Sequence, residues 1–359
     1  MMILKLIIGL IFLIIGAEAL VKGASKIARA VGISPLVIGL TVVAFGTSSP
    51  EMAVSVMAVS EGNSDIALGN VVGSNIFNIL FILGLCALIL PLIVAQQLIR
   101  LDVPVMIAAS LIVMLFGFDG RLMAWEGLVM VTIGFVYTVY IIRESRKEKN
   151  KEVLKEYQEE YGKDNKGKGK IWLSVLFVIA GLAFLILGSR WLVEGAVYIA
   201  HTLGVSDLVI GLTIIAAGTS LPEVATSIIA TIRGERDIAV GNVVGSNIFN
   251  ILFILGISSM VGKGGIGVAE SAIIFDIPVM LAVAIACLPI FFTGRKIERW
   301  EGGIFLFYYI AYTVYLILSN QTNASMDVFT SAMTWFVVPL TLLTIIIVTM
   351  REYRRTRRV

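Results

Sequence analysis

The sequence has little charge and few of the side chains that bind soft metals. Only 15% of its 359 residues are charged, whereas soluble chains carry about 25%. Its one histidine, His201, excludes a zinc or iron site built from a cluster of histidine and cysteine. The two cysteines, Cys86 and Cys287, lie far apart within apolar runs. We therefore interpret them as small core residues, outside any disulfide framework.

Apolar surface is what the chain has in excess. Hydrophobic residues make up 58% of it, and its mean hydropathy is +0.95. No soluble fold hides this much apolar surface, so a bilayer must act as solvent, which excludes a cytoplasmic enzyme. The apolar stretches are apolar on nearly all faces, which excludes an alternating-strand barrel. About eleven spans are expected, approximately over 3–21, 36–59, 66–90, 103–118, 124–142, 171–189, 208–232, 238–261, 277–293, 301–318 and 328–350.

Basic residues between the spans predict the orientation, because they mark cytoplasmic ends. They gather after the first span, in the linker 143–170, after the span 277–293 and at 351–358. With alternating spans, this places the N-terminus outside and the C-terminus in the cytoplasm. The linker is rich in Lys and Glu and is interpreted as a solvated connector between two halves.

The most informative feature is an internal repeat. Gly46–Leu85 recurs 172 residues later as Gly218–Ile257, and the segments Gly69–Gly84 and Gly241–Gly256 are identical. Each half holds about five spans, and an odd number means that the second copy enters the membrane from the opposite side. The predicted fold is therefore an all-α polytopic membrane protein of two inverted five-helix repeats. Identical groups from both copies would line a site on the axis between them.

Two glutamates lie near the middle of long apolar spans, at equivalent positions of the repeat. A charge at mid-bilayer costs about 2.5–3.5 kcal/mol. No Lys or Arg lies close to Glu51 or Glu223 in these spans. A bound cation is the simplest compensation, and a protonated carboxyl satisfied by a helix neighbour is the alternative.

A proline precedes each of these glutamates. Pro50 and Pro222 remove one backbone hydrogen bond each and are expected to free the carbonyls of Gly46 and Gly218. Unwound backbone at membrane depth is tolerated where it lines a cavity or binds an ion. The proline positions therefore support an ion site.

Hydroxyl and amide groups surround the glutamates in both copies. Thr47 and Ser48 precede Glu51 by four and three residues, so we expect hydroxyl and carboxylate to share one helix face. Hard oxygens of these kinds suit Ca²⁺ or Na⁺, and two carboxylates supply the charge that neutralises one Ca²⁺. The same pattern recurs at Thr219, Ser220 and Glu223, and polar stripes of every fourth residue follow at Asn70, Ser74 and Asn78 and at Asn242, Ser246 and Asn250.

Other paired features have local interpretations. The pairs Gly69 and Gly73, and Gly241 and Gly245, are expected to let helices approach closely. Opposite charges four residues apart predict local neutralisation, and an aspartate two residues before a proline predicts a helix N-cap. These are the pairs Glu18 with Lys22 and Arg190 with Glu194, and the aspartates Asp102 and Asp276.

At these motifs the chain resembles the cation/Ca²⁺ exchanger superfamily, and within it the prokaryotic Na⁺/Ca²⁺ exchangers. The motifs are GTSSPE with GNVVGSNIFN in the first half and GTSLPE with GNVVGSNIFN in the second. The resemblance covers about 1–318 and implies ten helices in two inverted repeats around clustered ion sites. It implies Ca²⁺ ligands at Glu51, Glu223, Thr47 and Thr219, and Na⁺ ligands at Ala44, Ser48, Glu51, Ser74, Asn78, Ala216, Ser220, Glu223, Ser246 and Asn250.

The resulting division of the chain is a first repeat at 1–142, the linker at 143–170, a second repeat at 171–318, and an extra transmembrane helix with a basic tail at 319–359. The predicted function is Na⁺/Ca²⁺ antiport by alternating access, and the alternative is a Ca²⁺/H⁺ antiporter that uses the same glutamates. Asparagine at both 78 and 250, where relatives often have one aspartate, argues against K⁺ dependence.

Two other function classes are disfavoured. The inverted repeat argues against a passive channel, and no paired Asp or Ser/His set supports an intramembrane hydrolase. We therefore expect no enzyme activity, no catalytic residue and no cofactor. The expected partners are Ca²⁺, Na⁺ and the lipid bilayer, without nucleic acid and without an obligate protein partner.

Overall fold

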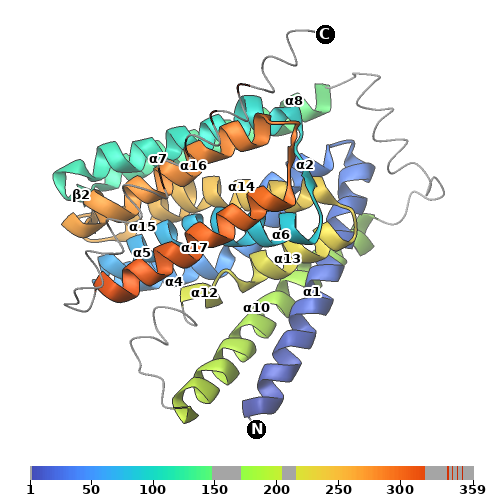
Figure 1. Ribbon diagram of the computed structural model, residues 1–359, viewed down its shortest axis with the longest axis horizontal. Helices are drawn as coiled ribbons and strands as arrows, with labels where there is room; N and C mark the ends of the chain where they lie inside the picture. The colour runs from blue at the N-terminus through green and yellow to red at the C-terminus, as the bar shows by residue number, and fades with distance from the viewer. Residues whose placement is uncertain are drawn as a thin grey trace.

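The computed structural model describes residues 2–147, 171–203 and 216–319, together with the single positions 338, 342, 346 and 350. Helices make up almost all of this part of the chain, which confirms an all-α membrane protein (Figure 1). The linker prediction falls largely outside the described residues. So does the predicted extra span at 328–350, of which only the four single positions are described, as helical residues with exposed side chains.

The first half is a series of long helices with short π-helical turns inside them. Such turns arise where one extra residue is inserted into an α-helix. The α-helices are α1 (Met2–Val31), α2 (Pro35–Ile38), α3 (Ala44–Thr47), α4 (Ser49–Ser60), α5 (Ser64–Phe77), α6 (Gly84–Ile89), α7 (Val103–Phe116) and α8 (Ala124–Lys147). The π-helices are η1 (Gly39–Val43), η2 (Asn78–Leu83) and η3 (Leu98–Asp102), and η4 (Gly117–Asp119) is a 3₁₀ turn.

The second half follows the same order wherever it is described. Its α-helices are α10 (Ile171–Thr202), α12 (Ala216–Gly218), α13 (Leu221–Ile232), α14 (Arg236–Phe249), α15 (Gly256–Val261), α16 (Ile277–Phe292) and α17 (Arg299–Ser319). Its π-helices are η7 (Asn250–Leu255) and η8 (Ala272–Asp276). The identical segment NILFIL forms η2 in one half and η7 in the other, so the repeat extends to this irregular turn.

Eight of the described helices or helix runs are long and apolar enough to cross a bilayer. A ninth span is the pair Pro35–Thr47 and Ser49–Ser60, which is bent by 46°. The span expected at 208–232 is described from residue 216 onward and contains the shorter apolar helix α13. The described part therefore contains up to nine of the eleven expected spans, and a piece of a tenth.

Helices α1 and α10 pack against each other along a glycine seam and extend together from the body of the molecule (Figure 1). A Cβ atom on Gly9 would lie 2.8 Å from the carbonyl oxygen of Gly188, and one on Gly23 would lie 2.8 Å from that of Ser174. The two helices are therefore antiparallel, as inverted copies require. Glycine recurs every seventh residue on both, at Gly9, Gly16 and Gly23 and at Gly181, Gly188 and Gly195.

Two short antiparallel ribbons connect the halves. Strand β1 (Leu92–Ile93) pairs with β4 (Lys296–Ile297), and β2 (Arg121–Leu122) pairs with β3 (Ile266–Gly267). Each ribbon takes one strand from each half. Backbone hydrogen bonds therefore hold the halves together at two places, in addition to helix packing.

The Trp-Glu-Gly motif that recurs in both halves lies at the start of a helix, and its glycine lets that helix pack closely against a neighbouring helix. Glu126 accepts a hydrogen bond from the backbone N–H of Met123 at 2.7 Å, and Glu301 accepts one from that of Glu298 at 2.7 Å. Each of these contacts, from a carboxylate back to the backbone N–H three residues earlier, is one of the two contacts of a capping box. The glycine that follows, Gly302, has room for no side chain, since a Cβ would lie 2.6 Å from the carbonyl oxygen of Gly84.

The prediction of helix N-caps at Asp102 and Asp276 is wrong. Neither side chain caps its helix, because each aspartate already lies in helical backbone at the end of a π-helix. Asp102 instead accepts a hydrogen bond from the hydroxyl of Tyr137 at 2.8 Å, and Asp276 accepts one from Tyr312 at 2.9 Å. A neighbouring helix, and not the local backbone, satisfies each carboxylate.

The prediction of local ion pairs is confirmed for one of the two pairs and wrong for the other. Arg190 pairs with Glu194 at 3.2 Å as expected, and Glu194 also pairs with Lys5 at 2.7 Å. Glu18, however, forms its ion pair with Arg233 at the end of α13. Its expected partner, Lys22, lies over an aromatic ring of α10. Both cysteines are buried and free, as predicted.

Candidate functional site

Helix breaks at equivalent positions place the two glutamates. Helix α3 ends at Thr47, Ser48 leaves helical geometry with φ −83° and ψ 8°, and α4 begins at Ser49. The second half breaks in the same way at Ser220, with φ −86° and ψ 5°. The proline that follows each break stands in the first turn of the new helix, where its missing N–H costs nothing. Each glutamate is therefore in the first turn of a helix that starts inside the membrane.

The two carboxylates are fully buried and are oriented reciprocally. Glu51 is 0% exposed and Glu223 is 1% exposed. Ser220 donates a hydrogen bond to Oε1 of Glu51 at 2.9 Å, and Ser48 donates one to Oε1 of Glu223 at 2.8 Å. Both halves thus meet at one site, as expected for a site on an axis between two copies.

The threonines adjoining the breaks contact the opposite half as well. Thr47 donates a hydrogen bond to Oδ1 of Asn242 at 3.1 Å, and Thr219 donates one to Oδ1 of Asn70 at 3.3 Å. The expectation that Thr47 shares a helix face with Glu51 is therefore wrong. The helix is interrupted between them, so hydroxyl and carboxylate belong to separate helices.

Five buried oxygens, on the two glutamates and on the polar stripes that follow them, have no hydrogen-bond partner among the described residues. Such orphaned acceptors are rare in folded proteins because each costs about 1–3 kcal/mol. All five belong to residues that the sequence predicts as cation ligands. They are Oε2 of Glu51, Oε2 of Glu223, Oδ1 of Asn78, Oδ1 of Asn250 and Oγ of Ser246.

The remaining predicted ligands are placed as follows. The hydroxyls of Ser74 and Ser220 are hydrogen-bonded to each other at 3.1 Å, so these two members of one expected Na⁺ cluster are together. Ala44, expected beside Ser246, lies against the neighbouring Gly245. Ala216 is the first residue of α12, and its side chain lies outside the described part.

One of the carbonyls that proline was expected to free is already engaged. Ser189 on α10 donates a hydrogen bond to the carbonyl oxygen of Gly218 at 2.6 Å. At Gly46 the side chain of Leu182 packs so closely that a Cβ would lie 2.6 Å from it. Helix α10 therefore supports both broken helices from outside the site.

The two halves differ in how closely their site helices are covered. Asn242 is 0% exposed, whereas its equivalent, Asn70, is only half-buried. A Cβ on Gly245 would lie 2.6 Å from Leu40, which confirms close approach in the second half. At Gly69 and Gly73 no described atom lies within 4 Å of such a Cβ, so the same prediction gains no support in the first half.

Sequence reasoning missed two features of the site. Asn78 and Asn250 are the first residues of the π-helices η2 and η7, a turn type that often marks functional positions. Asn75 and Asn247, both 1% exposed, join the halves beside them. The signal available was the identity of the segment GSNIFN in both copies, which included these asparagines without distinguishing them.

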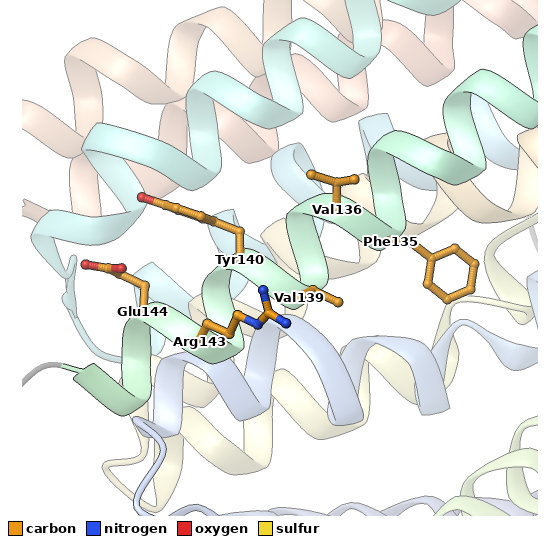
Figure 2. A pocket seen from close by; sticks show the side chains of 6 residues that line it. All are labelled: Phe135, Val136, Val139, Tyr140, Arg143 and Glu144. Carbon is orange, nitrogen blue, oxygen red and sulfur yellow. The ribbon is translucent and has the colours of Figure 1, made fainter.

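A separate apolar hollow lies on the exposed side of α8. Figure 2 shows Phe135, Val136, Val139 and Tyr140 along it, with Arg143 and Glu144 at one end. None of the residues that line it is a predicted ligand, and it takes no part in the site between the glutamates.

Comparison with known proteins identifies the family. A family model described as sodium/calcium exchanger protein matches residues 1–143 and 173–318. The sodium/calcium exchanger MaX1 of Methanosarcina acetivorans is 35% identical, over 87% of this chain and 97% of that protein. The inner membrane protein YrbG of Escherichia coli is 38% identical, over 78% of this chain and 85% of that protein.

A solved structure has the same fold. The structure of the sodium-calcium exchanger NCX_Mj superimposes with a TM-score of 0.74 at 30% identity, covering 90% of this chain and 98% of that one. Together with the site geometry, these matches confirm the resemblance on which the residue assignments depend. The chain belongs to the sodium/calcium exchanger protein family, whose members are membrane transporters that exchange a cation for Ca²⁺.

Proposed function

We propose that this chain exchanges Na⁺ for Ca²⁺ and that the two ions compete for the site between Glu51 and Glu223. The observation that carries the proposal is the set of five buried, unpartnered oxygens around these carboxylates. Each such oxygen is costly without a partner. A hard cation compensates carboxylate, amide and hydroxyl oxygens together, which makes these oxygens suitable Ca²⁺ and Na⁺ ligands.

The charge of the site supports antiport. Two ionised carboxylates carry −2, which one Ca²⁺ neutralises. An unneutralised charge of −2 inside the membrane is energetically costly. The protein therefore converts readily between the state open to one side and the state open to the other only when a cation occupies the site. Because Ca²⁺ and Na⁺ need the same two carboxylates, one ion must leave before the other binds. This competition couples the two fluxes.

The arrangement of the halves supports alternating access. The antiparallel first helices α1 and α10, and the reciprocal serine–carboxylate bonds, are what two inverted repeats around one site would produce. In the predicted orientation, with the N-terminus outside, inward Na⁺ flow expels Ca²⁺ from the cytoplasm. The assignment of MaX1 and NCX_Mj as sodium/calcium exchangers favours Na⁺ as the counter-ion.

The test is ⁴⁵Ca²⁺ uptake into proteoliposomes loaded with Na⁺, compared with vesicles loaded with K⁺ or carrying only a pH gradient. Uptake that requires internal Na⁺ is the expected result. Uptake driven by the pH gradient alone would overturn Na⁺ coupling and make the chain a Ca²⁺/H⁺ antiporter that uses the same glutamates.

The site assignment is tested in the same vesicles. Glu51→Gln and Glu223→Gln should each abolish Ca²⁺ uptake, because the remaining charge no longer neutralises Ca²⁺. Glu270→Gln is the matched control, since Glu270 is an exposed helical residue just before η8, and this variant should transport normally. Wild-type rates in either Glu51→Gln or Glu223→Gln would disprove the assignment.

A further inference from the structure

Asn75 and Asn247 face each other across the two halves of the molecule. Asn75 donates its Nδ2 hydrogen to the backbone carbonyl of Asn247 at 3.3 Å, and Asn247 donates to the carbonyl of Asn75 at 3.1 Å. Both side chains are 1% exposed. Since a carbonyl only accepts hydrogen bonds, these contacts fix which end of each amide is nitrogen and which is oxygen.

The oxygens of this pair hold the amides of two predicted ligands. Asn78 donates its Nδ2 hydrogen to Oδ1 of Asn247 at 3.0 Å, and Asn250 donates to Oδ1 of Asn75 at 3.1 Å. An amide whose nitrogen is held in this way must direct its oxygen elsewhere. The oxygens so directed are Oδ1 of Asn78 and Oδ1 of Asn250, two of the five unpartnered oxygens of the site.

We propose that Asn75 and Asn247 are positioning residues that orient the ligand oxygens of Asn250 and Asn78 toward the transported ion. The proposal rests on the proposed function, in which Ca²⁺ and Na⁺ compete for the same oxygens, so that the amides of Asn78 and Asn250, expected as Na⁺ ligands, also contact Ca²⁺. Each ligand amide is oriented from the opposite half: Asn75 acts on Asn250, and Asn247 acts on Asn78. Each π-helix that begins at a ligand asparagine is thereby fixed to an α-helix of the other half, η2 to α14 and η7 to α5.

The network also restricts which residue can stand at the ligand positions. A side chain at 78 or 250 must present a donor to an amide oxygen. A carboxylate there would bring two acceptors together in a buried place, which is costly. The network therefore favours a neutral side chain with a donor at these positions, an amide as in this chain or a protonated carboxyl, and it keeps the formal charge of the site at the −2 of the two glutamates.

The experiment is a pair of double-mutant cycles, with the KM for Ca²⁺ measured in proteoliposomes and Ca²⁺ binding measured by calorimetry in detergent without Na⁺. Asn75→Ala alone should weaken Ca²⁺ binding by about tenfold, because a buried hydrogen bond to a ligand is lost. In the Asn250→Ala background, the same substitution should change binding by less than about twofold, since the group on which Asn75 acts is gone.

The neighbouring pair supplies the control cycle. Asn75 and Asn78 lie three residues apart in the first half, but the side chain that accepts the hydrogen bond of the Asn78 amide is Asn247 of the second half. Asn75→Ala and Asn78→Ala should therefore be close to additive, whereas Asn247→Ala and Asn78→Ala should not. Tyr312→Phe removes a hydrogen bond far from these asparagines in the chain and should leave the KM for Ca²⁺ unchanged.

Two results would overturn the proposal. One is an effect of Asn75→Ala that is equally large with and without Asn250. The other is a loss of folded protein with an unchanged KM, which would make the pair merely structural. If Asn75→Ala does not fold, Asn75→Ser and the mirror cycle of Asn247 with Asn78 give the same test. Because Ca²⁺ binding is read without Na⁺, failure here is distinguishable from failure of Na⁺ coupling.

Discussion

Ser48 donates its hydroxyl hydrogen to Glu223 at 2.8 Å, although 175 residues separate the two in the chain. Ser220 does the same for Glu51 at 2.9 Å. Each half therefore orients the carboxylate that the other half contributes. A movement of one half relative to the other must change both carboxylates together, and this gives a physical basis for coupling ion binding to a change of conformation.

Removing either serine hydroxyl should weaken Ca²⁺ binding. A hydrogen bond to a charged group contributes about 1.5–3 kcal/mol, so Ser48→Ala and Ser220→Ala should each lower affinity at least about tenfold. The two effects should be similar because the bonds are reciprocal. Calorimetric titration with Ca²⁺ in the absence of Na⁺ measures both.

Ser49→Ala is the matched control for this prediction. Ser49 is adjacent to Ser48, but its hydroxyl is exposed and donates to the backbone carbonyl of Phe45. Its loss should leave Ca²⁺ affinity within about twofold of the wild type. An effect of Ser48→Ala no larger than that of Ser49→Ala would contradict a role for the buried hydroxyl.

The sequence was sufficient to predict the membrane fold and the two glutamates that the structure buries between the halves. Glu51 and Glu223 were recognisable because a charge within an apolar span is expensive and is retained only where it is compensated. The repeat then indicated that both copies contribute to one place. These inferences use composition and periodicity, which do not depend on the details of packing.

The hydrogen-bond partners could not be predicted in the same way. Rules of local spacing connect residues three or four apart on one helix. They paired Glu18 with Lys22 and made Asp102 a cap. Packing instead brought Arg233 to Glu18 and Tyr137 to Asp102, from other helices. The π-helix at Asn78 carries no residue signature, and only the structure revealed it.

Two adjacent glycines of α17 should respond differently to alanine. A Cβ on Gly302 would lie 2.6 Å from the carbonyl oxygen of Gly84, so Gly302→Ala must separate two packed helices and should cost about 1–3 kcal/mol of stability. On Gly303 a Cβ meets no described atom within 4 Å. Gly303→Ala should be neutral or gain up to about 1 kcal/mol from helix propensity. Thermal unfolding in detergent, compared between the two variants, checks this.

Tyr137→Phe should destabilise the protein without altering ion binding. Asp102 is 0% exposed, and the hydroxyl of Tyr137 is its shortest hydrogen bond, at 2.8 Å. The remaining donor, Gln97, is 3.3–3.5 Å away. Loss of the hydroxyl should therefore cost about 1–3 kcal/mol. A lower melting temperature with an unchanged KM for Ca²⁺ is expected, and a change of KM would instead connect Asp102 to the site.

The ion pair between Glu18 and Arg233 should affect the rate of exchange and not the affinity. It joins α1 to the end of α13 in the conformation described here. At the equivalent positions of the other copy the charges are reversed, with Arg190 on α10 and Glu61 after α4. Arg190 pairs here with Glu194 on its own helix. If the two halves exchange conformations during transport, the first pair should open as Arg190 approaches Glu61.

Charge reversal tests this exchange. Arg233→Glu should repel Glu18, destabilise the present conformation and alter the ⁴⁵Ca²⁺ exchange rate a few-fold, since an exposed pair contributes about 0.2–1 kcal/mol. The swapped double variant, Glu18→Arg with Arg233→Glu, should restore the rate because the attraction is restored. The same logic applies to Arg190→Glu with Glu61→Arg. If the double variant were as impaired as the single one, the ion pair would have no part in choosing between the conformations.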